Sequence, residues 1–150
     1  MLHPLTESAF AEKTNVSRET LRRLRSYADL LVRWQASINL VSENTLGDVW
    51  RRHFWDSMQL AQFVPQRPCV ITDLGSGAGF PGLVLSILLD IEVNLVDSSG
   101  KKVAFLREAA RVTDAKIILH EGRIEHLVLP KSDMVTSRAL APLNKLLGLA

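Results

Sequence analysis

Apolar residues recur at helical spacing in the first third of the chain. Two residues that favour helix starts, Asn15 and Ser17, precede the first stripe. The stripe consists of Leu21, Leu24, Ala28, Leu31, Trp34 and Ile38. Spacings of three and four residues place these side chains on one face, so the pattern predicts an amphipathic helix.

A second helix is expected from about Leu46 to Ala61. Its apolar positions include Val49, Trp50, Phe54, Met58 and Ala61. The polar segment 39–44 between the two helices is typical of a loop. Pro65 and Pro68 then end the helical region, because proline cannot continue a helix.

The pattern changes after Pro68 to short apolar runs that alternate with helical stretches. The expected strands are Val70–Leu74, Val93–Val96, Lys116–Leu119 and Asp133–Thr136. The expected helices are Gly82–Leu89, Lys101–Val112 and, more weakly, Ile124–Leu127. This alternation favours a parallel sheet with right-handed crossovers. We therefore expect a Rossmann-like α/β fold, in which a helical segment, 1–64, packs on a core formed by residues 65–150.

Composition sets broad limits on the class of protein. The chain has 150 residues, of which 47% are hydrophobic, and this is enough for one domain with a core. A net charge of +2 does not by itself indicate nucleic acid, and the single cysteine excludes an intrachain disulfide. Charged residues interrupt the N-terminal segment, so we do not expect it to be a signal peptide. The longest apolar run is too short to span a bilayer. We expect a cytoplasmic protein without a membrane partner, and the four histidines lack the spacing of a metal site.

Four glycines crowd the junction between the first expected strand and the next helix. Glycine there permits a tight turn and lets a ligand approach the main chain. The segment Gly77–Gly82 matches the dinucleotide pattern G-x-G-x-x-G, but that match alone is weak. Pro81 suits the first turn of the following helix.

Two carboxylates indicate which nucleotide the loop binds. Asp73 would be a poor neighbour for the anionic pyrophosphate of NAD, whereas the ammonium and sulfonium of S-adenosylmethionine would attract it. Asp97, at the end of the next strand, can accept hydrogen bonds from both ribose hydroxyls in either cofactor. Asp73 therefore favours the methyl donor, whereas Asp97 supports nucleotide binding without discriminating between the cofactors.

Several segments together resemble the GidB/RsmG family. They are Asn39-Leu40, the R-H-x-x-D-S element at 52–57, the glycine loop at 73–82, residues 95–102 with Phe105-Leu106, and Ser137–Ala139. Members of that family are bacterial methyltransferases that modify N7 of one guanosine in 16S ribosomal RNA. The resemblance implies S-adenosylmethionine as cofactor, and 16S ribosomal RNA or the small ribosomal subunit as substrate.

The resemblance also implies roles for individual residues. The residues expected around the cofactor are Asp73, Gly75, Gly77, Phe80 and Asp97, with Ile124 and Glu125 beside the adenine and Arg138 where donor and guanine meet. Guanine N7 carries a lone pair and no proton, so no general base is needed, and catalysis would rest on alignment and electrostatics. Arg138 is the catalytic candidate.

Cationic side chains are the candidates for RNA contact. The family motif points to Arg52 and His53, and Arg123 is a further candidate; Arg51, Lys101, Lys102, Arg107 and Arg111 could also bind phosphates. A solvated charged face is the alternative for the cationic residues of the helix 101–112. A structural role is the alternative for His53, which together with Asp56 could hold its helix against the glycine loop.

The segment Leu143–Ala150 is expected to be a helix cut short, and the family continues beyond this point. We therefore expect a core incomplete at its C-terminus. With strand order 3-2-1-4 the fourth strand would be an open apolar edge, which permits weak self-association of an otherwise monomeric chain.

Two other functions stay open: an NAD-dependent oxidoreductase, from the literal glycine pattern, and a non-catalytic cofactor- or RNA-binding module.

Overall fold

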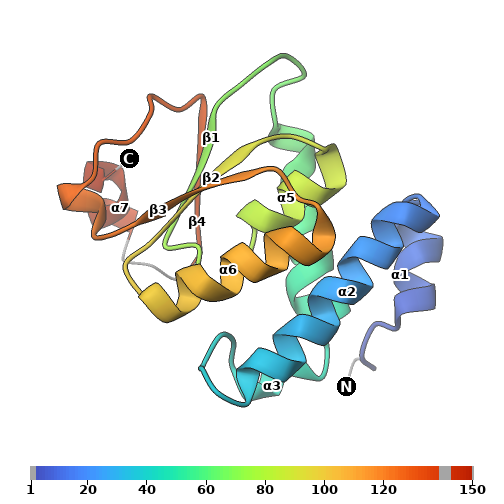
Figure 1. The fold of residues 1–150 in the computed structure, drawn as a ribbon. Coiled ribbons are helices and arrows are strands. Elements are labelled where there is room, and N and C mark those ends of the chain that lie inside the picture. Colours follow the sequence, from blue (N-terminus) through green and yellow to red (C-terminus); the bar gives the residue numbers. More distant parts are fainter. Residues whose placement is uncertain (1–2, 139–142, 150) are drawn as a thin grey trace.

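The chain folds around a four-stranded parallel sheet. The computed structural model describes residues 3–138 and 143–149. The strands are β1 (Ile71–Leu74), β2 (Val93–Asp97), β3 (Ile117–Glu121) and β4 (Met134–Ser137), in the order β3-β2-β1-β4 (Figure 1). The expected α/β class, strand order and strand positions are confirmed.

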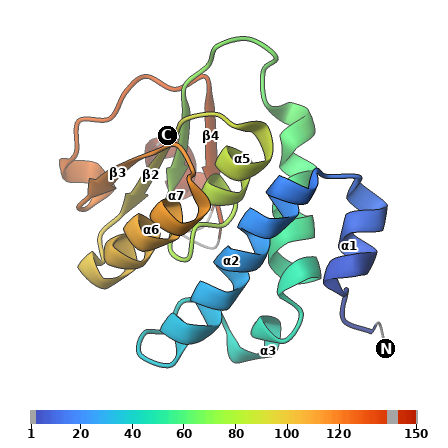
Figure 2. The same ribbon diagram turned by 45° about the vertical axis from the view of Figure 1, so that its right-hand side comes forward.

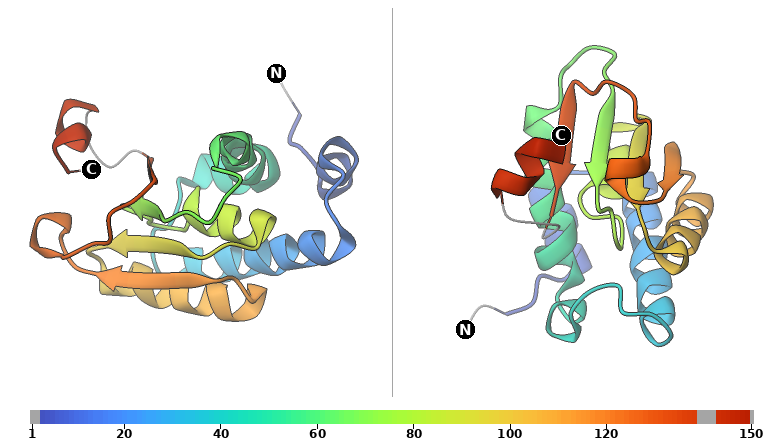
Figure 3. Two further views of the ribbon diagram at one scale, coloured as in Figure 1. Left: turned by 90° about the horizontal axis from the view of Figure 1, so that it is seen from above. Right: turned by 90° about the vertical axis from the view of Figure 1, so that its left-hand side faces the viewer.

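Helices α5 (Gly82–Leu89) and α6 (Gly100–Thr113) are the two crossovers that follow β1 and β2. Helix α5 packs on β2, and α6 lies along β2 and β3 (Figures 1 and 3). Their apolar faces form one core with the sheet, because a parallel strand must bury its side chains under crossover helices. Both helices match their predicted ranges to within one residue.

The N-terminal helices pack on this core from outside. Helix α2 (Arg18–Gln35) crosses α5 and α6 and buries Leu24 and Leu31 of the predicted stripe. The Ser17 hydroxyl caps α2 by accepting from Thr20 N–H at 3.0 Å, as expected. Asn15 has a different role: in the left-handed conformation it ends the preceding helix, α1 (Glu7–Thr14). Helix α1 lies at the end of the molecule away from the sheet (Figure 2).

The predicted second helix is broken and changes its winding. Helix α3 (Glu43–Leu46) ends before Gly47, and a π-helical segment, Trp50–Trp55, is followed by α4 (Asp56–Met58) and by the 3-10 segment Gln59–Phe63. The break is held by Asp48, whose Oδ1 accepts from Leu5 N–H at 2.8 Å. Short π-helical segments are frequent at functional sites because they shift successive side chains around the helix. Here the segment buries His53 and Phe54 together.

The remaining elements are short. The weak helix predicted at 124–127 is a single 3-10 turn, Ile124–His126. Its backbone bonds run from His126 N–H to the Arg123 carbonyl and from Leu127 N–H to the Ile124 carbonyl. Helix α7 (Leu143–Leu149) falls within the predicted C-terminal helix. Within the described ranges no helix has the length and apolarity needed to cross a membrane.

Candidate functional site

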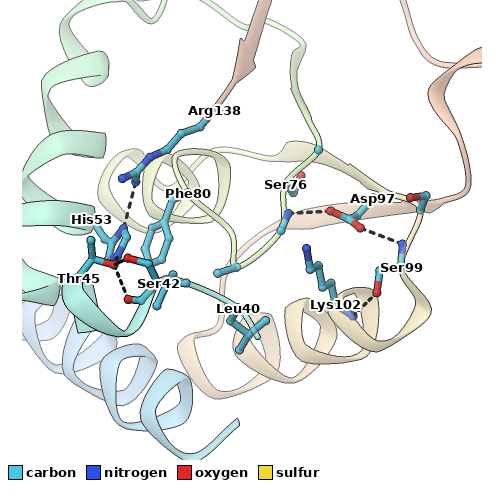
Figure 4. A pocket seen from close by; sticks show the side chains of 15 residues that line it. Leu40, Ser42, Thr45, His53, Ser76, Phe80, Asp97, Ser99, Lys102 and Arg138 are labelled. Atoms are coloured by element: carbon cyan, nitrogen blue, oxygen red, sulfur yellow. Dashed lines mark hydrogen bonds between the residues drawn. The ribbon is translucent and has the colours of Figure 1, made fainter. Parts of the chain in front are cut away.

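A cavity of about 500 Å³ opens at the carboxyl ends of β1 and β2, and we call it the glycine-loop cavity. It is lined by Leu40, Val41, Ser42, Thr45, His53, Gly75, Ser76, Gly77, Ala78, Phe80, Asp97, Ser98, Ser99, Lys102 and Arg138 (Figure 4). Ligands of open parallel sheets bind at this edge, where the strand order reverses direction. Five of the residues predicted around the cofactor meet here: Gly75, Gly77, Phe80, Asp97 and Arg138.

Asp97 holds two backbone segments at the floor of the cavity. Its Oδ2 accepts from Gly77 N–H and its Oδ1 from Ser99 N–H, each at 2.9 Å. Each carboxylate oxygen keeps a further lone pair, because an ionised carboxylate offers about four acceptor sites. The residue is therefore fixed in orientation and still able to bind hydroxyl groups in the cavity.

The glycine loop needs glycine for two different reasons. Gly75, Gly77 and Gly79 all have positive φ angles, of 67°, 56° and 97°. Behind Gly79 there is also no space, since an added Cβ would lie 2.4 Å from the Tyr27 hydroxyl and 2.9 Å from Leu83 Cβ. The loop is thus pressed against α2 on its inner side and faces the cavity on its outer side.

Tyr27 anchors the loop from beneath and was not anticipated from the sequence. Its fully buried hydroxyl donates to the carbonyl of Ala78, and burial raises the pKa of Tyr27 well above its ordinary value. Its ring stacks on Phe80 with ring centroids 5.3 Å apart. The only sequence signal is that Tyr27 lies next to Ala28 on the apolar stripe of α2.

Asp73 does not reach the cavity, and this corrects our expectation that its carboxylate would face the cofactor. The side chain is completely buried under the loop. Its Oδ2 accepts from Gly82 N–H at 3.2 Å and its Oδ1 from the Thr136 hydroxyl at 2.8 Å. Burial raises the pKa of Asp73 to about 6, despite these donors. Asp73 therefore joins β1, α5 and β4 and supports the loop indirectly.

His53 stands at the other end of the cavity, between Phe80 and two polar neighbours. Its ring lies against Phe80 at a centroid distance of 4.6 Å. Its Nε2 is 2.9 Å from Thr45 Oγ1, and Arg138 Nη1 lies 3.1 Å from its Nδ1 (Figure 4). Because a guanidinium can only donate, Nδ1 accepts, and the ring proton is on Nε2 and donates to Thr45.

The environment of His53 keeps its imidazole neutral. Burial, together with the positive charges of Arg138 and Arg52, lowers the pKa of His53 to about 4. Only 4% of the residue is exposed. The geometry therefore supports the positioning role left open above, and does not support the expectation that His53 binds an RNA phosphate.

Arg138 links the end of β4 to the helix 49–63. Its Nη1 donates to His53, its Nη2 donates to the carbonyl of Arg52 at 3.1 Å, and Asp56 Oδ2 is 3.9 Å away. The guanidinium is thus held on three sides while it borders the cavity. The side chain of Arg52 itself is exposed, in agreement with its predicted availability to RNA.

Besides Asp73 and Arg52, three predicted site residues lie away from the cavity. Ile124 and Glu125 belong to the 3-10 turn after β3, and neither borders the cavity. Arg123 is largely exposed, with its Nε 3.8 Å from Glu125 Oε2. The structure instead brings Leu40 and Val41 to the cavity wall, from the loop that follows α2. The polar segment containing them gave no signal of this long-range packing.

Comparison with known proteins now identifies the family. The model of the GidB family, described as rRNA small subunit methyltransferase G, matches residues 20–150. The chain belongs to this family. It is 54% identical over 143 residues to ribosomal RNA small subunit methyltransferase G of Rhodospirillum rubrum, an alignment covering 95% of this chain and 71% of the relative.

Other GidB relatives agree with this assignment. The chain is 55% identical over 141 residues to the ribosomal RNA small subunit methyltransferase G of Rhodospirillum centenum, and covers 65% of it. The protein of that name from Gluconobacter oxydans is 52% identical over 134 residues, with 69% of its length covered. This GidB chain thus spans roughly two thirds of the length of the relatives it matches.

A solved structure supports the fold alone. An RNA methyltransferase structure from Pyrococcus horikoshii superposes with a TM-score of 0.51 at 16% identity, over 81% of this chain and 57% of the other. At this identity the similarity confirms the α/β fold and carries no residue roles.

Proposed function

We propose that this GidB-family chain binds S-adenosylmethionine in the glycine-loop cavity and methylates N7 of a guanosine in 16S ribosomal RNA. One observation carries the proposal: Asp97 and the backbone of Gly77 form a single rigid unit at the carboxyl ends of β1 and β2. Membership of a family named for ribosomal RNA methylation supplies the substrate class. From this substrate class we infer a cytoplasmic protein, with the ribosomal subunit or its RNA as partner.

The residues present fit the nucleoside part of the cofactor. The free lone pairs of Asp97 suit a ribose diol, and Leu40 and Phe80 provide apolar walls. The loop glycines leave the main chain open to close approach. The volume of about 500 Å³ lies within the roughly 300–1,000 Å³ typical of small-molecule sites.

The reaction asks little of the protein's side chains. When bound, S-adenosylmethionine supplies an electrophilic methyl group, whose bond to sulfur breaks as the bond to guanine N7 forms, the electron pair staying on sulfur. N7 has no proton to lose, so no residue acts as a base. The chain's contribution is alignment, with Asp97 holding the nucleoside end and Arg138 fixed at the acceptor end.

Calorimetric titration with S-adenosylhomocysteine tests cofactor binding. We expect saturable binding that weakens at least tenfold in Asp97→Ala, because the variant loses both the acceptor for the ribose and the brace on Gly77. Asp29→Ala, an exposed carboxylate on α2, is the matched control and should bind like wild type. Binding of NADH in place of S-adenosylhomocysteine would contradict the proposal and favour an oxidoreductase.

Transfer of a radiolabelled methyl group to 16S ribosomal RNA or to small subunits tests the second half of the proposal. We expect label in 7-methylguanosine after digestion of the RNA. Cofactor binding without any transfer would instead support the non-catalytic binding module that the sequence left open.

A further inference from the structure

A second cavity, of about 430 Å³, lies next to the first and shares Arg138 with it. It is lined by Asp56, Ser57, Gln59, Leu60, Gln62, Phe63, Pro81, Ser137 and Arg138. Its walls are the helix 56–63, the start of α5 and the end of β4. Because Phe80 borders the first cavity and Pro81 the second, one peptide unit separates them.

We call this second cavity the acceptor cavity. Two hydroxyls of residues that line it have no hydrogen-bond partner among the residues the structure describes. They are Ser57 Oγ, in a residue only 3% exposed, and Ser137 Oγ. Leaving a buried hydroxyl without a partner costs about 1–3 kcal/mol, and such groups are uncommon in folded proteins. Both residues line the same cavity. Both oxygens are shielded from solvent, so a polar ligand in the cavity would satisfy either of them once its side chain had rotated toward the ligand.

The charges beside these hydroxyls indicate the kind of ligand. Asp56 has an exposed carboxylate, and Arg138 Nη2 lies 3.9 Å from its Oδ2. A carboxylate only accepts hydrogen bonds, and a guanidinium only donates them. Guanine presents two adjacent donors, N1–H and the 2-amino group, followed by the O6 acceptor. Adenine presents an acceptor at N1, so the pair does not match it.

We propose that the acceptor cavity binds the guanine base, with Asp56 reading N1–H and the 2-amino group. This inference rests on the proposed function and specifies the acceptor side of the same site. With O6 turned toward Arg138, the neighbouring N7 faces the glycine-loop cavity that Arg138 also lines. Phe63, a residue that is 66% exposed, lines the cavity and can stack on an unpaired base.

Asp56 would also favour the reaction itself. Methylation turns neutral guanine into a cation, and no proton leaves N7. The positive charge makes N1–H a stronger donor, so its hydrogen bond to Asp56 strengthens as the new bond forms. An interaction that is stronger in the transition state than in the bound substrate accelerates the chemical step.

Titration of the isotope-labelled chain with guanosine 5′-monophosphate, followed by nuclear magnetic resonance, tests the base site directly. We expect amide shifts at Asp56, Ser57 and Ser137, and at least tenfold weaker binding of adenosine 5′-monophosphate. Inosine 5′-monophosphate lacks the 2-amino group and should lie between them. The Asp56→Asn variant should lose the preference for guanine, while Asp29→Asn, an exposed carboxylate on α2, should keep it.

Ser57→Ala separates binding from structure. Removing an unpartnered hydroxyl should leave the free energy of unfolding unchanged or raise it, while guanine binding weakens. Equal affinity of wild type and Asp56→Asn for the guanine nucleotide, or equal affinity for guanine and adenine, overturns the proposal. Because these titrations do not require the methyl donor, absence of S-adenosylhomocysteine binding overturns the proposed function separately.

Discussion

The imidazole of His53 lies nearly parallel to the ring of Phe80, at an angle of 15°. This contact joins the π-helical segment Trp50–Trp55 to the glycine loop, two parts of the chain that approach only in the folded state. Because Arg138 bonds to the other edge of the imidazole, the loop, the helix and β4 share one anchor.

We expect His53 to titrate near pH 4 as the Nε2–H tautomer. Burial disfavours the charged form of the imidazole, and Nδ1 accepts a hydrogen bond from Arg138. Heteronuclear imidazole spectra recorded between pH 3 and 8 measure both properties. An Nδ1–H tautomer, or protonation near the ordinary pKa of 6.5, would show that the Arg138 contact does not form in solution.

The same residue makes stability depend on pH. The folded-state pKa of His53, about 4, is below the ordinary 6.5. The contribution of neutral His53 to the free energy of unfolding is therefore complete above about pH 6.5 and is lost as the pH falls toward 4. The shift corresponds to at most about 3 kcal/mol. Chemical denaturation of wild type and His53→Gln over this range should give a difference in unfolding free energy that increases with pH.

Asp73 should act in the opposite direction. Its folded-state pKa of about 6 is above the ordinary 3.8, so its contribution is complete below about pH 3.8 and declines as the pH rises through 6. We expect the stability difference between wild type and Asp73→Asn to shrink over this interval by about 3 kcal/mol at most. A difference that grows with pH would indicate that the Thr136 and Gly82 donors outweigh burial.

Gly79→Ala should destabilise the chain strongly. The new Cβ meets the Tyr27 hydroxyl and Leu83 at a φ of 97°, and strain and overpacking cost about 1–3 kcal/mol each. Gly47→Ala is the matched control, because its Cβ meets nothing within 4 Å and its φ is −70°. Denaturant titration compares the two, and a Gly79→Ala chain as stable as the control would contradict the packing described.

Arg138→Lys should reduce methyl transfer at least tenfold while changing the affinity for S-adenosylhomocysteine less than threefold. Lysine keeps the charge but cannot donate to His53 Nδ1 and the Arg52 carbonyl together. Single-turnover transfer assays and calorimetry measure the two quantities. Arg18→Lys, at an exposed position of α2, serves as control. Equal losses in both variants would indicate a general effect of arginine replacement.

The sequence by itself determined the sheet, its order and the location of the site. Period-two and period-3.6 patterns report which faces are buried, and a glycine-rich turn after a strand reports the edge where ligands bind. The placement of Asp97 in the cavity was predictable for this reason, because it follows from the position of this residue at the end of β2. The family motifs located Arg138 in the same way.

Only the tertiary structure decided which polar groups face the ligand. Asp73 and Asp97 both follow the sequence pattern of a cofactor carboxylate, yet Gly82 and Thr136 bind the first beneath the loop while the second faces the cavity. The π-helical winding around His53 and the contact of Tyr27 with Ala78 also depend on residues distant in sequence. Burial and hydrogen-bond partners are set by packing between elements, and local patterns carry no record of them.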